Sequence, residues 1–209
     1  MPLTNLLNEA IHRLDGKQLL GADASVSVRL PGTQDMLLGA PAQAPQQLSL
    51  TAARDSAAWH AAVYRTRADV GAIAMGGGAY GRSLGDFGGA LPQVFDEQAR
   101  HLGRTALPLS DLRGDPKNSA ERCLATGGNA WSCGGTMLVF GSTAQRLALN
   151  AELLEKCAKA YVLAAASGAA IHTLPWWVCY IANGRLKKDQ RKATARFAQG
   201  LLPEEVKGY

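Results

Sequence analysis

The glycines that follow an apolar segment are the first residues in the chain whose spacing suggests chemistry. Gly76, Gly78 and Gly81 fit the pattern GxGxxG, and Asp96 lies twenty residues after Gly76. In dinucleotide-binding proteins, amides at such a turn face a pyrophosphate and the acidic residue contacts a ribose. A tight strand-to-helix turn explains the same glycines, and the residues before Asp96 are poor strand formers. Both interpretations stay open, with the structural one favoured.

Histidine and cysteine, the usual protein ligands of transition metals, are scattered along the chain. They are His12, His60, His101, His172, Cys123, Cys133, Cys157 and Cys179. No CxxC pair and no Cys/His pair at zinc spacing occurs among them. The sequence therefore predicts no local metal site, and it predicts that the cysteines are reduced residues of the core.

The composition is that of a folded protein with a substantial core. Of the 209 residues, 47% are hydrophobic, and 22 Lys and Arg against 17 Asp and Glu leave a formal charge of +5. A chain of this length buries roughly 70% of its unfolded surface. No apolar run reaches the 18 or so residues that span a membrane. We expect a cytoplasmic protein, built as a single domain over residues 1–209, without a membrane partner.

The positive charge is concentrated at one end. Residues 185–209 hold seven Lys or Arg and three Asp or Glu, so this basic C-terminal extension carries most of the excess. Its cations are not interleaved with aromatic residues, as they are in many nucleic-acid-binding surfaces. We expect a solvated helix face and no nucleic-acid partner.

Hydrophobic periodicity places helices and strands in alternation. Helices are expected from Thr4 to Gly16, from Thr51 to Thr66, at 96–102, after Pro116, from Ser142 to about Gly168 and at 189–199. Strands are expected at 25–29 and 36–38 as a hairpin, at 70–75, and as a pair within 130–140, with loop at 39–47. This mixture predicts an α/β fold.

Several separate segments, taken in order, resemble the class II aldolase/adducin family. They are the strand 24–29, the helix-to-strand segment 60–70 with its His, Tyr, Arg and Asp, the helix 95–103, and the strand and long helix 136–165. The resemblance covers about Leu3 to Gly168. It implies a three-layer αβα fold with a central mixed, mainly antiparallel sheet, commonly assembled as a cyclic tetramer. Members include fuculose-phosphate aldolases and ribulose-phosphate epimerases.

The resemblance also implies where a metal would be bound. Members hold a divalent cation, often zinc, with a His-x-His pair after a strand and a third histidine in the strand before the long helix. These positions are occupied by Met75, Gly77 and Gly135, with Cys133 two residues from the last. None is a histidine, so no cofactor is predicted.

Further site positions differ from the family pattern. The acid/base glutamate falls on Ser56, beside Asp55, and the asparagine that contacts the substrate's anionic group falls on Ser25. The family's Pro-Ser-Gly turn corresponds to 39–41. Changes at so many positions predict a divergent member that lacks the family's aldolase activity. Such a member would have a structural, regulatory or assembly role.

An alternative is an enzyme that uses the same cleft for metal-independent chemistry on a small polar or anionic substrate. The weak catalytic candidates are Asp55, His60 and Cys133, with Tyr80, Glu97, Arg100 and His101 as further polar residues, and the amides of Gly76, Gly77 and Gly78 are available to an anion. In either case we expect a homo-oligomer, with a tetramer favoured. Trp176 and Trp177 are candidates to cover a neighbour's surface.

Overall fold

The computed structural model describes residues 2–103, 107–109, 117, 121, 127–133 and 135–205, without the side chains of 107–109 and 133. Its helices are α1 (Leu3–Gly16), α2 (Asp55–Thr66), α3 (Ala79–Ser83), the 3-10 turn η1 (Leu84–Phe87), α4 (Asp96–His101), α6 (Ala144–Ala166) and α7 (Trp176–Ala198). Most of the helix expected after Pro116 lies outside the described residues. No helix in the described ranges has the length and apolarity needed to cross a membrane.

Within the described residues, seven strands form one sheet. They are β1 (Ser25–Arg29), β2 (Asp35–Gly39), β3 (Gln46–Ser49), β4 (Ala72–Gly76), β5 (Leu107–Leu109), β6 (Ala130–Cys133) and β7 (Thr136–Gly141). Their order across the sheet is β3-β2-β1-β4-β7-β6-β5. All neighbours are antiparallel except β5, which runs parallel to β6. The mixed, mainly antiparallel sheet expected from the resemblance is confirmed.

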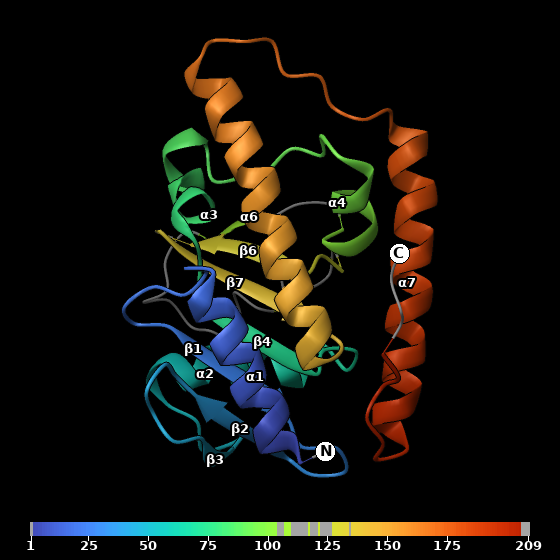
Figure 1. Ribbon diagram of the computed structural model, residues 1–209. Coiled ribbons are helices and arrows are strands. Elements are labelled where there is room, and N and C mark those ends of the chain that lie inside the picture. Colours follow the sequence, from blue (N-terminus) through green and yellow to red (C-terminus); the bar gives the residue numbers. More distant parts are fainter. Residues whose placement is uncertain are drawn as a thin grey trace.

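Helices cover both faces of this sheet, because alternate strand residues point to opposite sides. Ala72 and Ala74 of β4 belong to the apolar cluster that includes α1 and α6. Ile73, between them, belongs to the cluster formed with α2. Figure 1 shows α1 and α6 crossing one face, with α2 behind the other. The result is the expected αβα arrangement.

The largest differences from the sequence-based expectations are in α7 and β3, while α2 begins at Asp55 instead of Thr51. The last basic helix was expected at 189–199, whereas α7 begins thirteen residues earlier, at Trp176. Its first half has no regular amphipathic pattern, and the signal that marks its start is Pro175, whose fixed φ suits a helix beginning. The basic extension from residue 185 is therefore the second half of a longer helix. In addition, β3 lies in a region where the sequence predicted loop up to residue 47.

Candidate functional site

The strand register brings most of the predicted site positions to one end of the sheet. Ser25, the first residue of β1, pairs with Met75 of β4, and Gly76 pairs with Met137 at the start of β7. Gly135 lies in the turn between β6 and β7, two residues before Met137. Ser25, Met75 and Gly76 therefore lie at one end of the sheet, next to the start of β7.

The space beside Gly77 is filled. A Cβ built on Gly77 would lie 2.8 Å from both Cβ and Cγ of Met137, and the φ of Gly77 is +106°, a backbone conformation that side chains rarely tolerate. Met75 is half-buried against the cluster on the α2 side, whereas Gly135 is exposed with open space around it. The three positions together offer one thioether and no side-chain nitrogen or oxygen, so this donor set does not fit zinc.

The glycine turn after β4 receives a carboxylate from the protein itself. Glu155 of α6 accepts hydrogen bonds from the backbone amides of Tyr80 and Gly81, each at 2.8 Å, at the start of α3. The cavity at this turn, between Gly77, Met137 and Glu155, has a volume of about 10 Å³. A single water needs roughly 10–15 Å³. The amides here are satisfied by Glu155.

The dinucleotide interpretation of the same glycines is wrong. That fold requires parallel neighbours for the strand before the glycines, whereas β4 is antiparallel to both β1 and β7. Asp96 lies at the start of α4 and ends no strand of the sheet. The glycines form a tight strand-to-helix turn, the interpretation that the sequence favoured.

A buried polar network extends inward from Ser25. Ser25 Oγ is 2.9 Å from His60 Nε2, and His60 Nδ1 is 2.7 Å from Ser27 Oγ. Ser27 Oγ is in turn 2.8 Å from the hydroxyl of Tyr64. All four side chains are buried, His60 and Ser27 completely. Both ring nitrogens of His60 are therefore hydrogen-bonded, and neither is left to receive a proton from solvent.

Burial sets the protonation state of this network. Desolvation lowers the pKa of His60 to about 3 and raises the pKa of Tyr64 above its ordinary value. A general base works best with a pKa near the operating pH, and no carboxylate among the described residues contacts the ring to stabilise an imidazolium. The contacts therefore make His60 a residue that positions Ser25. Ser27 and Tyr64 were not predicted as site residues, although Tyr64 follows His60 by one helical turn.

Solved structures provide the decisive comparison. YgbL from Escherichia coli, a putative aldolase/epimerase/decarboxylase, matches with a TM-score of 0.72 and 16% identity, over 87% of this chain and 97% of that chain. An L-fuculose 1-phosphate aldolase matches with a TM-score of 0.73 and 18% identity, over 88% and 94%. An aldolase II superfamily protein from Pseudomonas syringae gives 0.66 and 13%, over 97% and 95%. The chain has the class II aldolase fold.

At these identities the likeness concerns the fold. No family profile and no curated protein matches the chain by sequence. Within the class II aldolase fold, the start of α2 carries Asp55 and Ser56, both exposed, and Asp55 has a φ of +51°. Ser56 precedes His60 by one turn and shares its helix face. No hydrogen bond links Asp55 or Ser56 to Ser25 in the described part of the chain.

The remaining catalytic candidates are not gathered at this end of the sheet. Glu97 pairs with Lys156 at 2.9 Å, and His101 lies 3.3 Å from Arg146, both between α4 and α6. Arg100 belongs to the same short helix. The side chain of Cys133 lies outside the described residues. The structure brings Ser25 and His60 together and places Glu97, Arg100 and His101 on a separate helix, α4.

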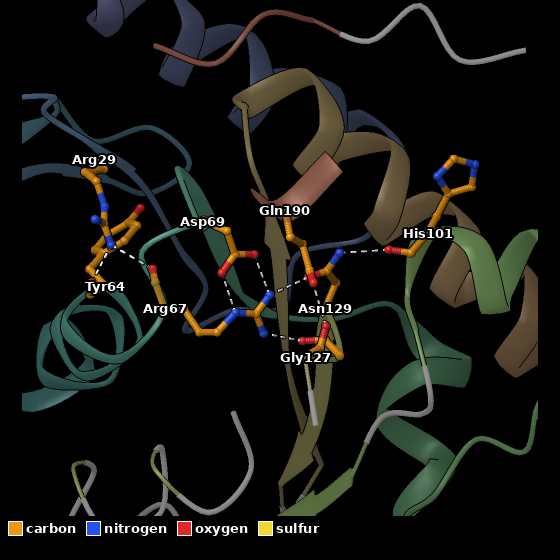
Figure 2. A network of polar contacts seen from close by, with 9 residues as sticks. Arg29, Tyr64, Arg67, Asp69, His101, Gly127, Asn129 and Gln190 are labelled. Atoms are coloured by element: carbon orange, nitrogen blue, oxygen red, sulfur yellow. Dashed lines mark hydrogen bonds and ion pairs between the residues drawn. The ribbon is translucent and has the colours of Figure 1, made fainter. Parts of the chain in front are cut away.

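A second polar network, drawn in Figure 2, accounts for the Arg and Asp of the helix-to-strand segment. Arg67 binds both carboxylate oxygens of Asp69, at 2.6 and 2.7 Å, and donates to the carbonyl of Gly128 and the amide oxygen of Asn129. Arg29 donates to the carbonyl of Arg67 at 2.9 Å. These contacts join β1, the end of α2 and the segment before β6, so their role is to hold the fold.

Proposed function

We propose that this protein keeps the class II aldolase fold in a structural, regulatory or assembly role, without metal-dependent aldol cleavage. The observation that carries the proposal is the contact of Met137 with Gly77. Family members place an imidazole at this position to hold the cation that polarises a substrate carbonyl. Here Cβ and Cγ of Met137 lie 2.8 Å from the point where a Cβ of residue 77 would be, so a side chain at residue 77 would require Met137 to move.

The rest of the site supports the proposal. Methionine sulfur prefers soft metals, and glycine has no side-chain donor, so Met75, Gly77 and Gly135 do not replace three imidazoles. Ser56 stands at the acid/base position and has no ionisable proton near neutral pH. The amides of Tyr80 and Gly81, which would otherwise attract a substrate anion, are bonded to Glu155. The metal ligands, the acid/base residue and the anion-binding amides thus all differ from the family pattern.

We also propose that the protein is cytoplasmic. Cys157 and Cys179 are free thiols, and burial raises the pKa of Cys157 to about 12. A buried thiol with a raised pKa reacts slowly, and free thiols in a fold of this size fit a reducing compartment.

One observation favours a second candidate function, metal-independent chemistry on a small polar or anionic substrate. The hydroxyl of Ser25 is held by His60 at 2.9 Å, at the position where the family contacts its substrate. A fixed hydroxyl at a sheet end is a binding group for an oxygen-rich molecule. This candidate predicts that such a ligand raises the Tm of the native protein and that Ser25→Ala abolishes the shift.

The test of the main proposal measures metal and activity together. We expect the purified protein, incubated with zinc and then desalted, to contain no stoichiometric divalent metal by elemental analysis, and to show no cleavage of fuculose 1-phosphate. The positive control is an L-fuculose 1-phosphate aldolase of the same fold, taken through the same zinc loading, desalting and cleavage assay. Zinc retained by the native protein at one equivalent, or measurable cleavage, would overturn the proposal.

A further inference from the structure

The first two turns of α7 expose four large apolar side chains. Trp176 is 78% exposed, Trp177 54%, Tyr180 73% and Ile181 59%. We call these four residues the aromatic face. Scattered exposed leucines are ordinary on a protein surface, but a contiguous group of two indoles, a phenol and an isoleucine is not. Trp and Tyr are also the residue types that dominate binding energy in protein interfaces.

The four residues lie on one side of the helix, since 176 and 180, and 177 and 181, are each one turn apart. The opposite side of α7 packs on the protein through Leu186, Ala193 and Phe197, which are buried. Figure 1 shows α7 at the edge of the molecule, joined to α6 by the extended segment 167–175. The aromatic face is therefore accessible to a partner.

The first half of α7 is uncharged and the second half is basic. From residue 169 to 184 the chain has no Lys, Arg, Asp or Glu, whereas the exposed side of the second half is basic. The cations there are Arg185, Lys187, Lys188, Arg191 and Lys192, all of them exposed or half-buried. An interfacial membrane helix instead separates its apolar and basic sides around the helix axis. The arrangement along the axis favours a protein partner for the aromatic face.

We propose that the aromatic face packs against the same face of a second copy of this chain, with the two α7 helices antiparallel about a two-fold axis. A contact of this kind is self-complementary, because each copy presents the same patch. With about 200 Å² for a free aromatic side chain, the three rings expose about 400 Å² per copy, and a pair buries about 800 Å² from rings alone. Ile181 and the flanking helix surface bring this to about 1,000 Å², the lower limit for a specific interface.

The antiparallel orientation follows from the charges. An axis near residues 178 and 179 directs the two basic halves away from each other. With a rise of about 1.5 Å per residue, the two Lys187 side chains are then about 25 Å apart along the helices. This exceeds the Debye length of about 8 Å at physiological salt, so the like charges do not oppose the pairing. Parallel helices would bring the same cations together.

Sedimentation velocity over a range of protein concentrations tests the pairing. We expect the full chain to self-associate, and we expect Tyr180→Glu to weaken this at least about 30-fold, as for other interface anchors. Lys188→Glu is the matched control, since it introduces the same side chain on the same helix outside the aromatic face. It should leave the association unchanged.

Fluorescence gives an independent readout. Trp59 and Trp131 are buried, whereas Trp176 and Trp177 are exposed in the single chain. Acrylamide should therefore quench Trp176 and Trp177 at low protein concentration, and pairing should protect them as the concentration rises. Tyr180→Glu should remove the protection, and Lys188→Glu should keep it.

Three outcomes would overturn the inference. One is a native protein that stays monomeric with quenchable indoles at about 100 µM. Another is an oligomer that Tyr180→Glu leaves intact, which would place the contact elsewhere. The third is a monomer whose indoles become protected only on phosphatidylserine vesicles, which would assign the face to a membrane surface. None of these results depends on metal content, so the inference and the proposed function fail separately.

Discussion

The carboxylate of Glu155 occupies the space beside Gly78 where a side chain would otherwise lie. A Cβ at residue 78 would be 2.5 Å from Cδ of Glu155 and 2.6 to 2.7 Å from its two oxygens. Glycine at this position lets the α6 carboxylate reach the amides at the start of α3. The relationship links the long helix to the turn after β4 and is the clearest reason for one of the glycines in that turn.

Gly78→Ala should destabilise the protein by about 1–3 kcal/mol, because the methyl group displaces a hydrogen-bonded carboxylate. Urea unfolding followed by circular dichroism measures the change. Gly85→Ala is the control, since a Cβ there meets no atom within 4 Å. An equal loss in both variants would show that contact with Glu155 is not the cause.

Glu155→Gln should cost about 1–3 kcal/mol, since it replaces a charged acceptor of two backbone amides with a neutral one. The double variant with Gly78→Ala should be more stable than the sum of the single changes predicts, because the two residues share one space. Glu152→Gln serves for comparison. That carboxylate binds the exposed Arg13 and Lys17, and its loss should cost less. Additive behaviour of Gly78→Ala and Glu155→Gln would contradict the coupling.

His60 should make stability depend on pH. Its pKa is lowered to about 3 in the folded protein, whereas an unfolded histidine titrates near 6.5. Between these values the unfolded chain binds the extra proton, so stability falls as the pH falls, by about 1.4 kcal/mol per pH unit attributable to this residue. Above about pH 6.5 the contribution is complete and constant.

Unfolding midpoints measured from pH 7 to pH 4 check this dependence. His60→Gln should be less stable at pH 7 and should show a shallower decline toward pH 4, because it removes the titrating group. His12→Gln, at an exposed position, should decline in parallel with the native protein. Parallel decline of the His60 variant as well would mean that the imidazole is not held neutral.

The sequence predicted the fold well because hydrophobic periodicity is a local signal, and because the order of the segments matches that of a known family. Alternation in β1 and the long apolar stripe of α6 each survive in the structure, and the αβα layers follow from them. Strand β3 was not predicted, because Gln46 and Gln47 are exposed residues of an edge strand and show no alternation of apolar and polar residues. The first half of α7 was not predicted for a similar reason, since its large apolar residues face solvent.

The site was predictable only as a set of positions. Ser25 and Met75 are paired at one end of the sheet, and Gly76 is paired with Met137 beside them. What fills the space between them comes from residues distant in sequence. Glu155 lies 74 or 75 positions from the amides that it binds, and no local pattern connects them. Met137 could be recognised as an occupant only once the strand register was known.

Arg67 provides a last test, of the network that joins α2 to the segment before β6. Arg67 is 7% exposed, and its guanidinium makes four hydrogen bonds, to Asp69, Gly128 and Asn129. Lysine has no planar fork to bind both oxygens of Asp69, so Arg67→Lys should cost about 2–4 kcal/mol in unfolding free energy. Lys17→Met removes an exposed ion pair and should cost less than about 1 kcal/mol. If Arg67→Lys is as mild as Lys17→Met, the buried pair does not hold these elements together.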